Sequence, residues 1–240
     1  MDGWALDLGT TNTGLAHWDA DADSARLLEL PLICRRPGRA DPLEAPRLIP
    51  SSTHLLPARD FWSRLGKTSF FLKRAFWGKQ AEIGRQALEL NEGWCHPQFA
   101  RSFKQYLGHA PHRTIARLRG ETISAREVAR IFMRELLANV KETTGERIRD
   151  LVITVPVESY DQYRAELAQL CSALGIKRVR FLDEPVAAAI GYGLGLKGSR
   201  KVLVVDFGGG TLVLALGDRN PRETELGGCT VIAKAGRPIG

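Results

Sequence analysis

A strand-like run that ends in an aspartate and a turn of small residues occurs twice, and this repeat is the chain's most constraining feature. The first copy spans residues 4–18 and carries Asp7, and the second spans residues 201–216 and carries Asp206. In each copy a second apolar run follows the turn, as in a β-hairpin. Two like hairpins so far apart, with a carboxylate at the same point of each, predict two related lobes that face a shared ligand.

The middle of the chain alternates between helical and strand patterns. Ser124 and Glu127 have the spacing of a capping box and predict the start of a helix that ends at Gly145. The following elements are a strand at 151–155, a helix that ends near Gly175 and a strand at 179–182. A short helix that Ala187, Ala188 and Ala189 begin and a buried strand at 201–207 complete the pattern. Alternating strands and helices are typical of a parallel sheet with helices on both faces. Here that sheet is joined to an antiparallel meander at 4–8, 14–18 and 25–30, so the predicted class is α/β. Residues 31–57 are expected to be mostly irregular, with a strand near 52–56.

Composition limits the classes of protein to consider. The 240 residues are 44% hydrophobic, which is enough for one large domain or two small ones. No run approaches the roughly 20 apolar residues of a membrane span, and the N-terminus lacks the pattern of a signal peptide. We therefore expect a cytoplasmic protein with no membrane partner. The cysteines at 34, 95, 171 and 229 are scattered, which favours reduced structural thiols over a metal site.

Positive charge is concentrated in residues 59–130, which hold 14 Lys or Arg against 6 Asp or Glu, a net of +8 compared with +7 for the whole chain. The same segment contains several aromatic residues, a combination also found on nucleic-acid surfaces. A solvated basic face over a small aromatic core explains the composition without any ligand. We therefore do not expect nucleic acid as a partner.

The two turns have the composition of phosphate-binding loops. The residues concerned are Gly9, Thr10, Thr11 and Asn12 in the first turn and Gly208, Gly209, Gly210 and Thr211 in the second. Glycine amides can approach an anion closely, and threonine hydroxyls add neutral donors. Asp7 and Asp206 would hold Mg²⁺ through water, because this ion keeps much of its hydration shell. For either turn alone, an Asx-turn that closes an ordinary hairpin remains an alternative.

A third segment, Leu-Asp-Glu-Pro-Val-Ala-Ala-Ala-Ile-Gly-Tyr-Gly at residues 182–193, makes the set more specific. With it, the chain resembles the seventy-kilodalton heat-shock proteins, with gaps, from Trp4 to Gly240, and only residues 20–81 align poorly. The resemblance implies an actin-like (ribonuclease-H-like) ATPase fold with ATP and Mg²⁺ as cofactors. Residues 1–198 would form the first lobe, with a variable basic subdomain at about 32–122, and residues 199–240 would begin a second, truncated lobe.

The resemblance also implies roles for individual residues. Asp7 and Asp206 would lie near the metal and the attacking water, Thr10, Thr11 and Thr211 on phosphates, Lys104 at the γ-phosphate, and Glu184 near the metal shell and the lobe hinge. The alternatives are a surface lysine for Lys104 and a carboxylate favoured by the helix dipole for Glu184. Pro156 and Arg164 match residues that relay nucleotide state, although a strand stop and a solvated helix residue explain them equally well.

The function implied is the ATP-binding and ATP-hydrolysing domain of a heat-shock-type chaperone. In the full-length protein its partners would be ATP or ADP, co-chaperones and unfolded clients. One departure matters, because Leu212 and Val213 stand where the family usually has an aromatic and an acidic residue. A binding-only pseudo-ATPase therefore remains an alternative, as do an actin-like filament protein and a sugar or metabolite kinase.

Overall fold

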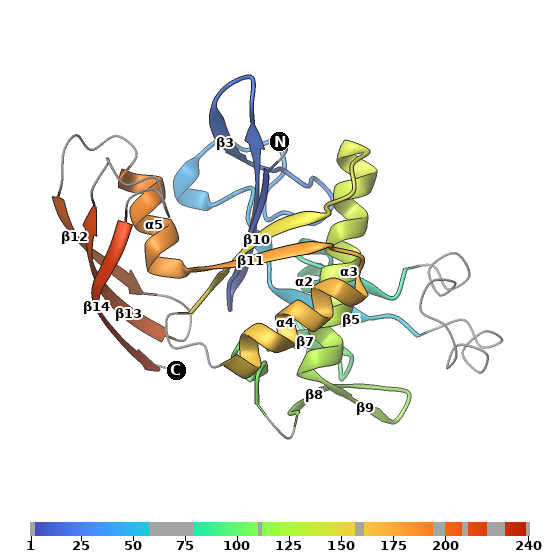
Figure 1. Cartoon of the computed structure of the whole chain (residues 1–240). Coiled ribbons are helices and arrows are strands. Elements are labelled where there is room, and N and C mark those ends of the chain that lie inside the picture. The colour runs from blue at the N-terminus through green and yellow to red at the C-terminus, as the bar shows by residue number, and fades with distance from the viewer. Residues whose placement is uncertain are drawn as a thin grey trace.

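A mixed sheet forms the centre of the molecule, shown in Figure 1 as a computed structural model that describes residues 3–57, 79–109, 112–156, 161–193, 200–207, 211–219 and 229–238. Its strands run in the order β11-β10-β1-β2-β3, and β4 pairs with β2. These strands are β1 (Gly3–Leu8), β2 (Asn12–Asp19), β3 (Ser24–Leu27), β4 (Ile49–Pro50), β10 (Asp150–Val155) and β11 (Arg178–Asp183). The pairs β1–β10 and β10–β11 are parallel, while β1–β2 and β2–β3 are antiparallel. The predicted α/β class, with a meander joined to parallel strands, is confirmed.

The two faces of this sheet have different neighbours. In β1, Leu6 and Leu8 are fully buried whereas Asp7 between them is exposed, as expected from the alternation of side chains along a strand. Leu6 and Leu8 share one core with residues of α3 (Ala125–Thr144) and α4 (Asp161–Ala173). In Figure 1, α5 (Glu184–Gly193) lies on the other side of the sheet from α3 and α4.

Local signals set the ends of α3 as predicted. The Ser124 hydroxyl accepts a hydrogen bond from the Glu127 amide, and the Glu127 carboxylate accepts one from the Ser124 amide. At the other end, Gly145 has a φ of 78° and its amide donates to the Lys141 carbonyl. Both devices satisfy backbone groups that a helix end leaves unpaired. The residues before Asp161, where α4 begins, lie outside the described ranges.

Smaller elements cover the core beside α3. They are the 3₁₀ helix η2 (Phe103–Tyr106), the strands β5 (Ser52–Leu55), β6 (Ala81–Ile83), β7 (Phe99–Arg101), β8 (Thr114–Leu118) and β9 (Glu121–Ser124), and the short helix α2 (Arg85–Glu89). A further 3₁₀ helix, η1 (Pro42–Glu44), is exposed at Leu43. The strand predicted near 52–56 is confirmed as β5. Residues 58–78, which contain the expected aromatic core of the basic segment, lie outside the described part of the chain.

A separate antiparallel sheet contains β12 (Arg200–Phe207), β13 (Thr211–Arg219) and β14 (Cys229–Pro238). The prediction that residues 201–207 form a buried strand of the parallel sheet is wrong. Val202 and Val204 pack against α5, but Leu203 and Val205 on the opposite face are 63% and 59% exposed. A continuous apolar run does not distinguish a strand covered on both faces from one covered on a single face.

The predicted repeat of two hairpins is confirmed. Asp7 pairs with Gly14 in the β1–β2 ladder, and Asp206 pairs with Val213 in the β12–β13 ladder. Each aspartate stands one pair before the end of its ladder, so both hairpins present their carboxylate at the same distance from the turn. The second turn, residues 208–210, lies outside the described ranges.

Two further expectations can be compared with the described residues. Of the four cysteines, Cys34 and Cys171 are buried and free, while Cys95 is free but exposed and therefore does not support the core. Among the described helices, none is long and apolar enough to cross a membrane.

Candidate functional site

The first turn is shaped by a glycine and held by a buried serine. A β-carbon on Gly9 would lie only 2.1 Å from the Asn12 carbonyl oxygen, so no other residue fits this backbone. The Ser51 hydroxyl donates a 2.7 Å hydrogen bond to the Gly9 carbonyl, and the Ser51 amide donates a 2.9 Å bond to the Thr11 carbonyl. With its carbonyl groups held in this way, the turn can form the backbone concavity that binds anions.

The carboxylate of Asp7 is oriented by a neighbouring strand. Thr154 lies beside Asp7 in the parallel β1–β10 ladder, and its hydroxyl donates a 2.7 Å hydrogen bond to Asp7 Oδ1. Sequence reasoning missed Thr154. The available signal was that it is the one polar residue in the apolar run at 151–155.

Lys104 and Glu184 form a buried ion pair. Lys104 is 8% exposed, and its Nζ donates a 2.5 Å hydrogen bond to Glu184 Oε1. The 3₁₀ helix that carries Lys104 is fixed by the preceding residue, Phe103, whose ring lies 5.1 Å from that of Phe132 in α3. The alternative of a surface lysine is therefore wrong, because the side chain is buried and paired.

Glu184 begins α5 and lies in a region of converging negative charge. The helix starts at this residue rather than at the later alanines and continues through Gly191. Burial raises the pKa of the Glu184 carboxyl, Lys104 opposes the rise, and the charges of Asp7 and Asp206 add to it. The negative charges that act on Glu184 besides its own are those of Asp7 and Asp206, and added negative charge of this kind favours a cation nearby.

The donor set fits Mg²⁺ held through water. Within the described part of the chain, no three His, Cys, Asp or Glu side chains form a cluster that could ligate one ion directly. Asp7 and Asp206 are both exposed carboxylates that could accept hydrogen bonds from the waters of a hydrated ion. Their oxygen chemistry is therefore compatible with Mg²⁺, which readily keeps several waters.

Part of the second hairpin is described only by its backbone. Asp206 is exposed near the end of β12, and Thr211 begins β13. The expected phosphate-binding residues Gly208, Gly209 and Gly210 lie outside the described residues. Lys104 and Glu184 are thus in direct contact and the charges of Asp7 and Asp206 act on Glu184, while the second phosphate turn stays a prediction.

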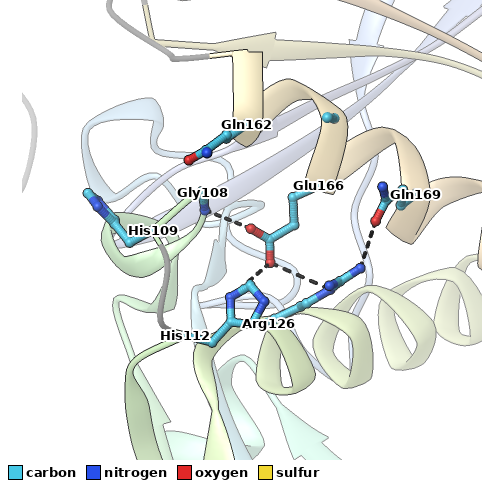
Figure 2. Close-up of a pocket in the computed structure, with 8 residues that line it drawn as sticks. Gly108, His109, His112, Arg126, Gln162, Glu166 and Gln169 are labelled. Atoms are coloured by element: carbon cyan, nitrogen blue, oxygen red, sulfur yellow. Dashed lines mark hydrogen bonds and ion pairs between the residues drawn. The ribbon is translucent and has the colours of Figure 1, made fainter.

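The loop after Lys104 is anchored on α4 by an arrangement that the sequence analysis did not find. Gly108 has a φ of 75°, and a β-carbon on it would lie 3.0 Å from the backbone of Tyr163. The Gly108 amide donates a 2.7 Å hydrogen bond to Glu166 Oε2, as Figure 2 shows. Because η2, which carries Lys104, ends only two residues before Gly108, this contact fixes the loop that follows Lys104.

Glu166 is enclosed by groups from three elements. Its side chain is 7% exposed, and its Oε1 lies 3.7 Å from Arg126 Nε and 4.0 Å from His112 Nδ1. Arg126 also donates a 2.8 Å hydrogen bond to Gln169 in α4 (Figure 2). An open pocket lies over this cluster, and its lining consists of Gly108, His109, His112, Arg126, Gln162, Ala165, Glu166 and Gln169. The cluster ties α3, α4 and the loop that follows Lys104 together.

The two candidate relay residues, Pro156 and Arg164, are linked to Asp183, the residue that precedes Glu184. Arg164 Nη2 in α4 donates a 2.8 Å hydrogen bond to Asp183, the residue before Glu184. Pro156 follows Val155, which pairs with Asp183 in the β10–β11 ladder. Both residues are therefore positioned beside the start of α5.

Comparison with known proteins gives matches for part of the chain. The family model described as Hsp70 protein matches residues 102–218. The chaperone protein DnaK of Deinococcus deserti is 36% identical over 118 residues, which cover 45% of this chain and 19% of that protein. The Thermus thermophilus DnaK is 34% identical over 120 residues, covering 46% and 20% respectively.

The matched region has two limits that matter for the site. The aligned part of the chain spans about a fifth of the length of these relatives. The family match contains Lys104, Glu184 and Asp206, but the first hairpin with Asp7 lies before it. Residues 102–218 are thus similar to the Hsp70 family, and the mixed α/β sheet is consistent with the actin-like ATPase fold of that family.

Proposed function

We propose that this chain is an ATP-binding and ATP-hydrolysing part of a heat-shock-type chaperone. The observation that carries the proposal is the buried Lys104–Glu184 pair, on which the charges of Asp7 and Asp206 converge. Phosphoryl transfer to water depends mainly on positioning and charge neutralisation, and these residues are suited to both.

In this proposal the first hairpin binds the phosphate groups. The backbone of the Gly9–Asn12 turn faces the anion, and the hydroxyls of Thr10 and Thr11 add neutral donors. The bonds from Ser51 keep the turn in one conformation, so little of its freedom is lost when a phosphate binds. In the second hairpin, Thr211 and the glycines at 208–210 would bind phosphate in the same way.

The charged residues have distinct proposed roles. Asp7 and Asp206 would hold Mg²⁺ through water, and the ion would supply positive charge near the phosphate oxygens. Lys104 neutralises the γ-phosphate, and Glu184 keeps the ammonium group in place with its 2.5 Å hydrogen bond. Thr154 fixes Asp7 so that this carboxylate can orient a water for attack.

The proposal also covers the organisation of the longer protein. Residues 1–198 form the first lobe, with the variable basic subdomain at about 32–122, and residues 199–240 begin the second. Pro156 and Arg164 relay nucleotide state towards a substrate-binding domain, with co-chaperones and unfolded clients as partners and the cytoplasm as location. Support for the relay comes from the Arg164–Asp183 bond beside Glu184.

The test is a calorimetric titration of the chain with Mg·ATP, together with hydrolysis under single-turnover conditions. Asp206→Ala removes a proposed metal carboxylate, and Asp21→Ala is the matched control, an exposed aspartate in the distant β2–β3 turn. We expect saturable binding that Asp206→Ala abolishes and Asp21→Ala leaves unchanged. Equal binding by all three proteins, or none by the wild type, would contradict the proposed site.

A second candidate is a protein that binds ATP but hydrolyses it slowly. Val213 pairs with Asp206 in the β12–β13 ladder, at the position where related proteins usually have an acidic residue. Without that carboxylate, a cation next to Asp206 has one acidic neighbour fewer. If this candidate is right, Val213→Asp raises the single-turnover rate while the affinity for Mg·ATP changes little. An unchanged rate would count against this candidate.

A further inference from the structure

Arg35 follows a turn that is fixed to the core on both sides. The preceding residues Ile33 and Cys34 are fully buried, and their amides donate hydrogen bonds of 3.0 and 2.8 Å to the Leu30 carbonyl. The Arg35 amide itself donates a 2.9 Å bond to the Leu48 carbonyl. The backbone from which this side chain extends is therefore well defined.

Arg85 in α2 holds the same turn from outside. Its guanidinium donates hydrogen bonds of 3.1, 3.2 and 3.1 Å to the carbonyl oxygens of Pro31, Leu32 and Cys34. It also pairs with Glu89 at 2.6 Å. Three carbonyl groups bound by one arginine keep the turn rigid, so the position of Arg35 is set before any ligand arrives.

The Arg35 side chain reaches the first phosphate turn. Its Nε donates a 2.7 Å hydrogen bond to Asn12 Oδ1. Asn12 lies two residues before Gly14, the ladder partner of Asp7, so Asn12 and Asp7 project from the same face of the sheet. Arg35 is thus attached to the end of the turn, on the face that carries the Asp7 carboxylate.

Arg35 differs from its neighbours in charge pairing. Arg36 pairs with Glu44 at 2.5 Å and Arg47 pairs with Glu29 at 3.6 Å. Within the described ranges, Arg35 has no carboxylate partner, and its one side-chain acceptor is the neutral amide of Asn12. The two terminal amino groups of its guanidinium therefore carry a positive charge that no acidic group neutralises, in the fork geometry that suits phosphate oxygens.

We propose that Arg35 is an additional phosphate-binding residue, which contacts the polyphosphate chain of a nucleotide bound at the Gly9–Asn12 turn. The inference rests on the proposed function and deepens it. Like the Gly9–Asn12 turn that it contacts, Arg35 lies before residues 102–218, so the family match does not assign it a role. Asn12 would then bind phosphate through its backbone, because its side-chain oxygen is taken by Arg35.

The test uses the whole chain and two probes, Mg·ATP and Mg·tripolyphosphate, in calorimetric titrations. Arg35→Ala and Arg35→Lys are compared with Arg36→Ala, which removes an adjacent arginine that is already paired. Loss of a hydrogen bond to a charged group predicts that Arg35→Ala weakens tripolyphosphate binding about 10-fold or more. Arg35→Lys should recover part of this loss because it keeps the charge, and Arg36→Ala should bind like the wild type.

The outcomes separate this inference from the proposed function. If Arg35→Ala binds both probes as tightly as the wild type, the inference is wrong and the proposed function stands. If the wild type binds tripolyphosphate but not ATP, and Arg35→Ala loses that binding, Arg35 is a phosphate-binding residue as inferred, but the proposed ATP-binding function fails. No binding of either probe by the wild type overturns both, and circular dichroism of each variant confirms that it is folded.

Discussion

The hydroxyl of Thr154 donates a 2.7 Å hydrogen bond to the carboxylate of Asp7 from the neighbouring parallel strand. Thr154→Val keeps the shape of the side chain but removes this donor, so Asp7 loses its fixed orientation. We expect ATP hydrolysis to slow by about 10-fold, the effect of one hydrogen bond of ordinary strength, with little change in KM. Steady-state kinetics with Mg·ATP measures both quantities.

Thr154→Ser is the control for this prediction, because it restores the hydroxyl and should recover most of the rate. A valine variant with normal kcat, or a serine variant as slow as the valine variant, would show that Thr154 matters for packing alone.

The raised pKa of Glu184 gives a second prediction, on stability. Burial shifts this carboxyl above its ordinary value of 4.5, so the folded state holds the proton more tightly than the unfolded state. Between the two pKa values, the contribution of Glu184 to the free energy of unfolding therefore falls as pH rises. Glu184→Gln cannot ionise and lacks this dependence. Urea titrations from pH 4.5 upwards should show the stability of the wild type declining relative to Glu184→Gln, and a relative increase would refute the assignment.

Gly108→Ala should destabilise the protein more than Gly120→Ala. Both glycines have positive φ values, so both substitutions pay the cost of a left-handed backbone, about 1–2 kcal/mol. Only at Gly108 does the new methyl group meet the backbone of Tyr163, at 3.0 Å, whereas nothing lies within 4 Å at Gly120. Denaturant unfolding measures the difference, and equal losses would mean that the loop moves freely away from α4.

Glu166→Ala should reduce both stability and hydrolysis. The variant leaves the Gly108 amide without its acceptor, at a cost of about 1–3 kcal/mol, and loosens the loop that follows Lys104. Glu166→Gln keeps an oxygen for Gly108 but removes the charge beside Arg126 and His112, so it should retain more of both properties. Unfolding and kinetic measurements on the two variants check this order, and a glutamine variant worse than alanine would contradict it.

The sequence predicted those parts of the molecule that depend on local signals. The capping box at Ser124 and the terminating Gly145 lie within a few residues of the helix ends that they set. The two hairpins were found because a strand, an aspartate and a turn are adjacent in the chain. Lys104 and Glu184 were assigned through the resemblance to a family, since nothing local reveals that residues 80 positions apart form a pair.

The contacts that sequence reasoning missed depend on long-range register. Thr154 meets Asp7 only because β10 pairs with β1 in one particular alignment, which neither strand encodes by itself. Arg35 was passed over because it lies in a stretch that has almost no regular structure. The error at residues 201–207 has a similar origin, because the apolar pattern of a strand does not say which sheet it joins.

The helix α5 connects the Lys104–Glu184 pair to the sheet formed by β12, β13 and β14. Its first residue, Glu184, is bonded to Lys104, and further along Val186 and Ala189 pack with Val202 and Val204 of the second sheet. A helix of ten residues is about 15 Å long, so a tilt of about 5° displaces one end by about 1 Å relative to the other. Such a displacement is enough to break a 2.5 Å hydrogen bond. A small rotation of the second sheet, transmitted through α5, can therefore make or break the single ion pair between Lys104 and Glu184.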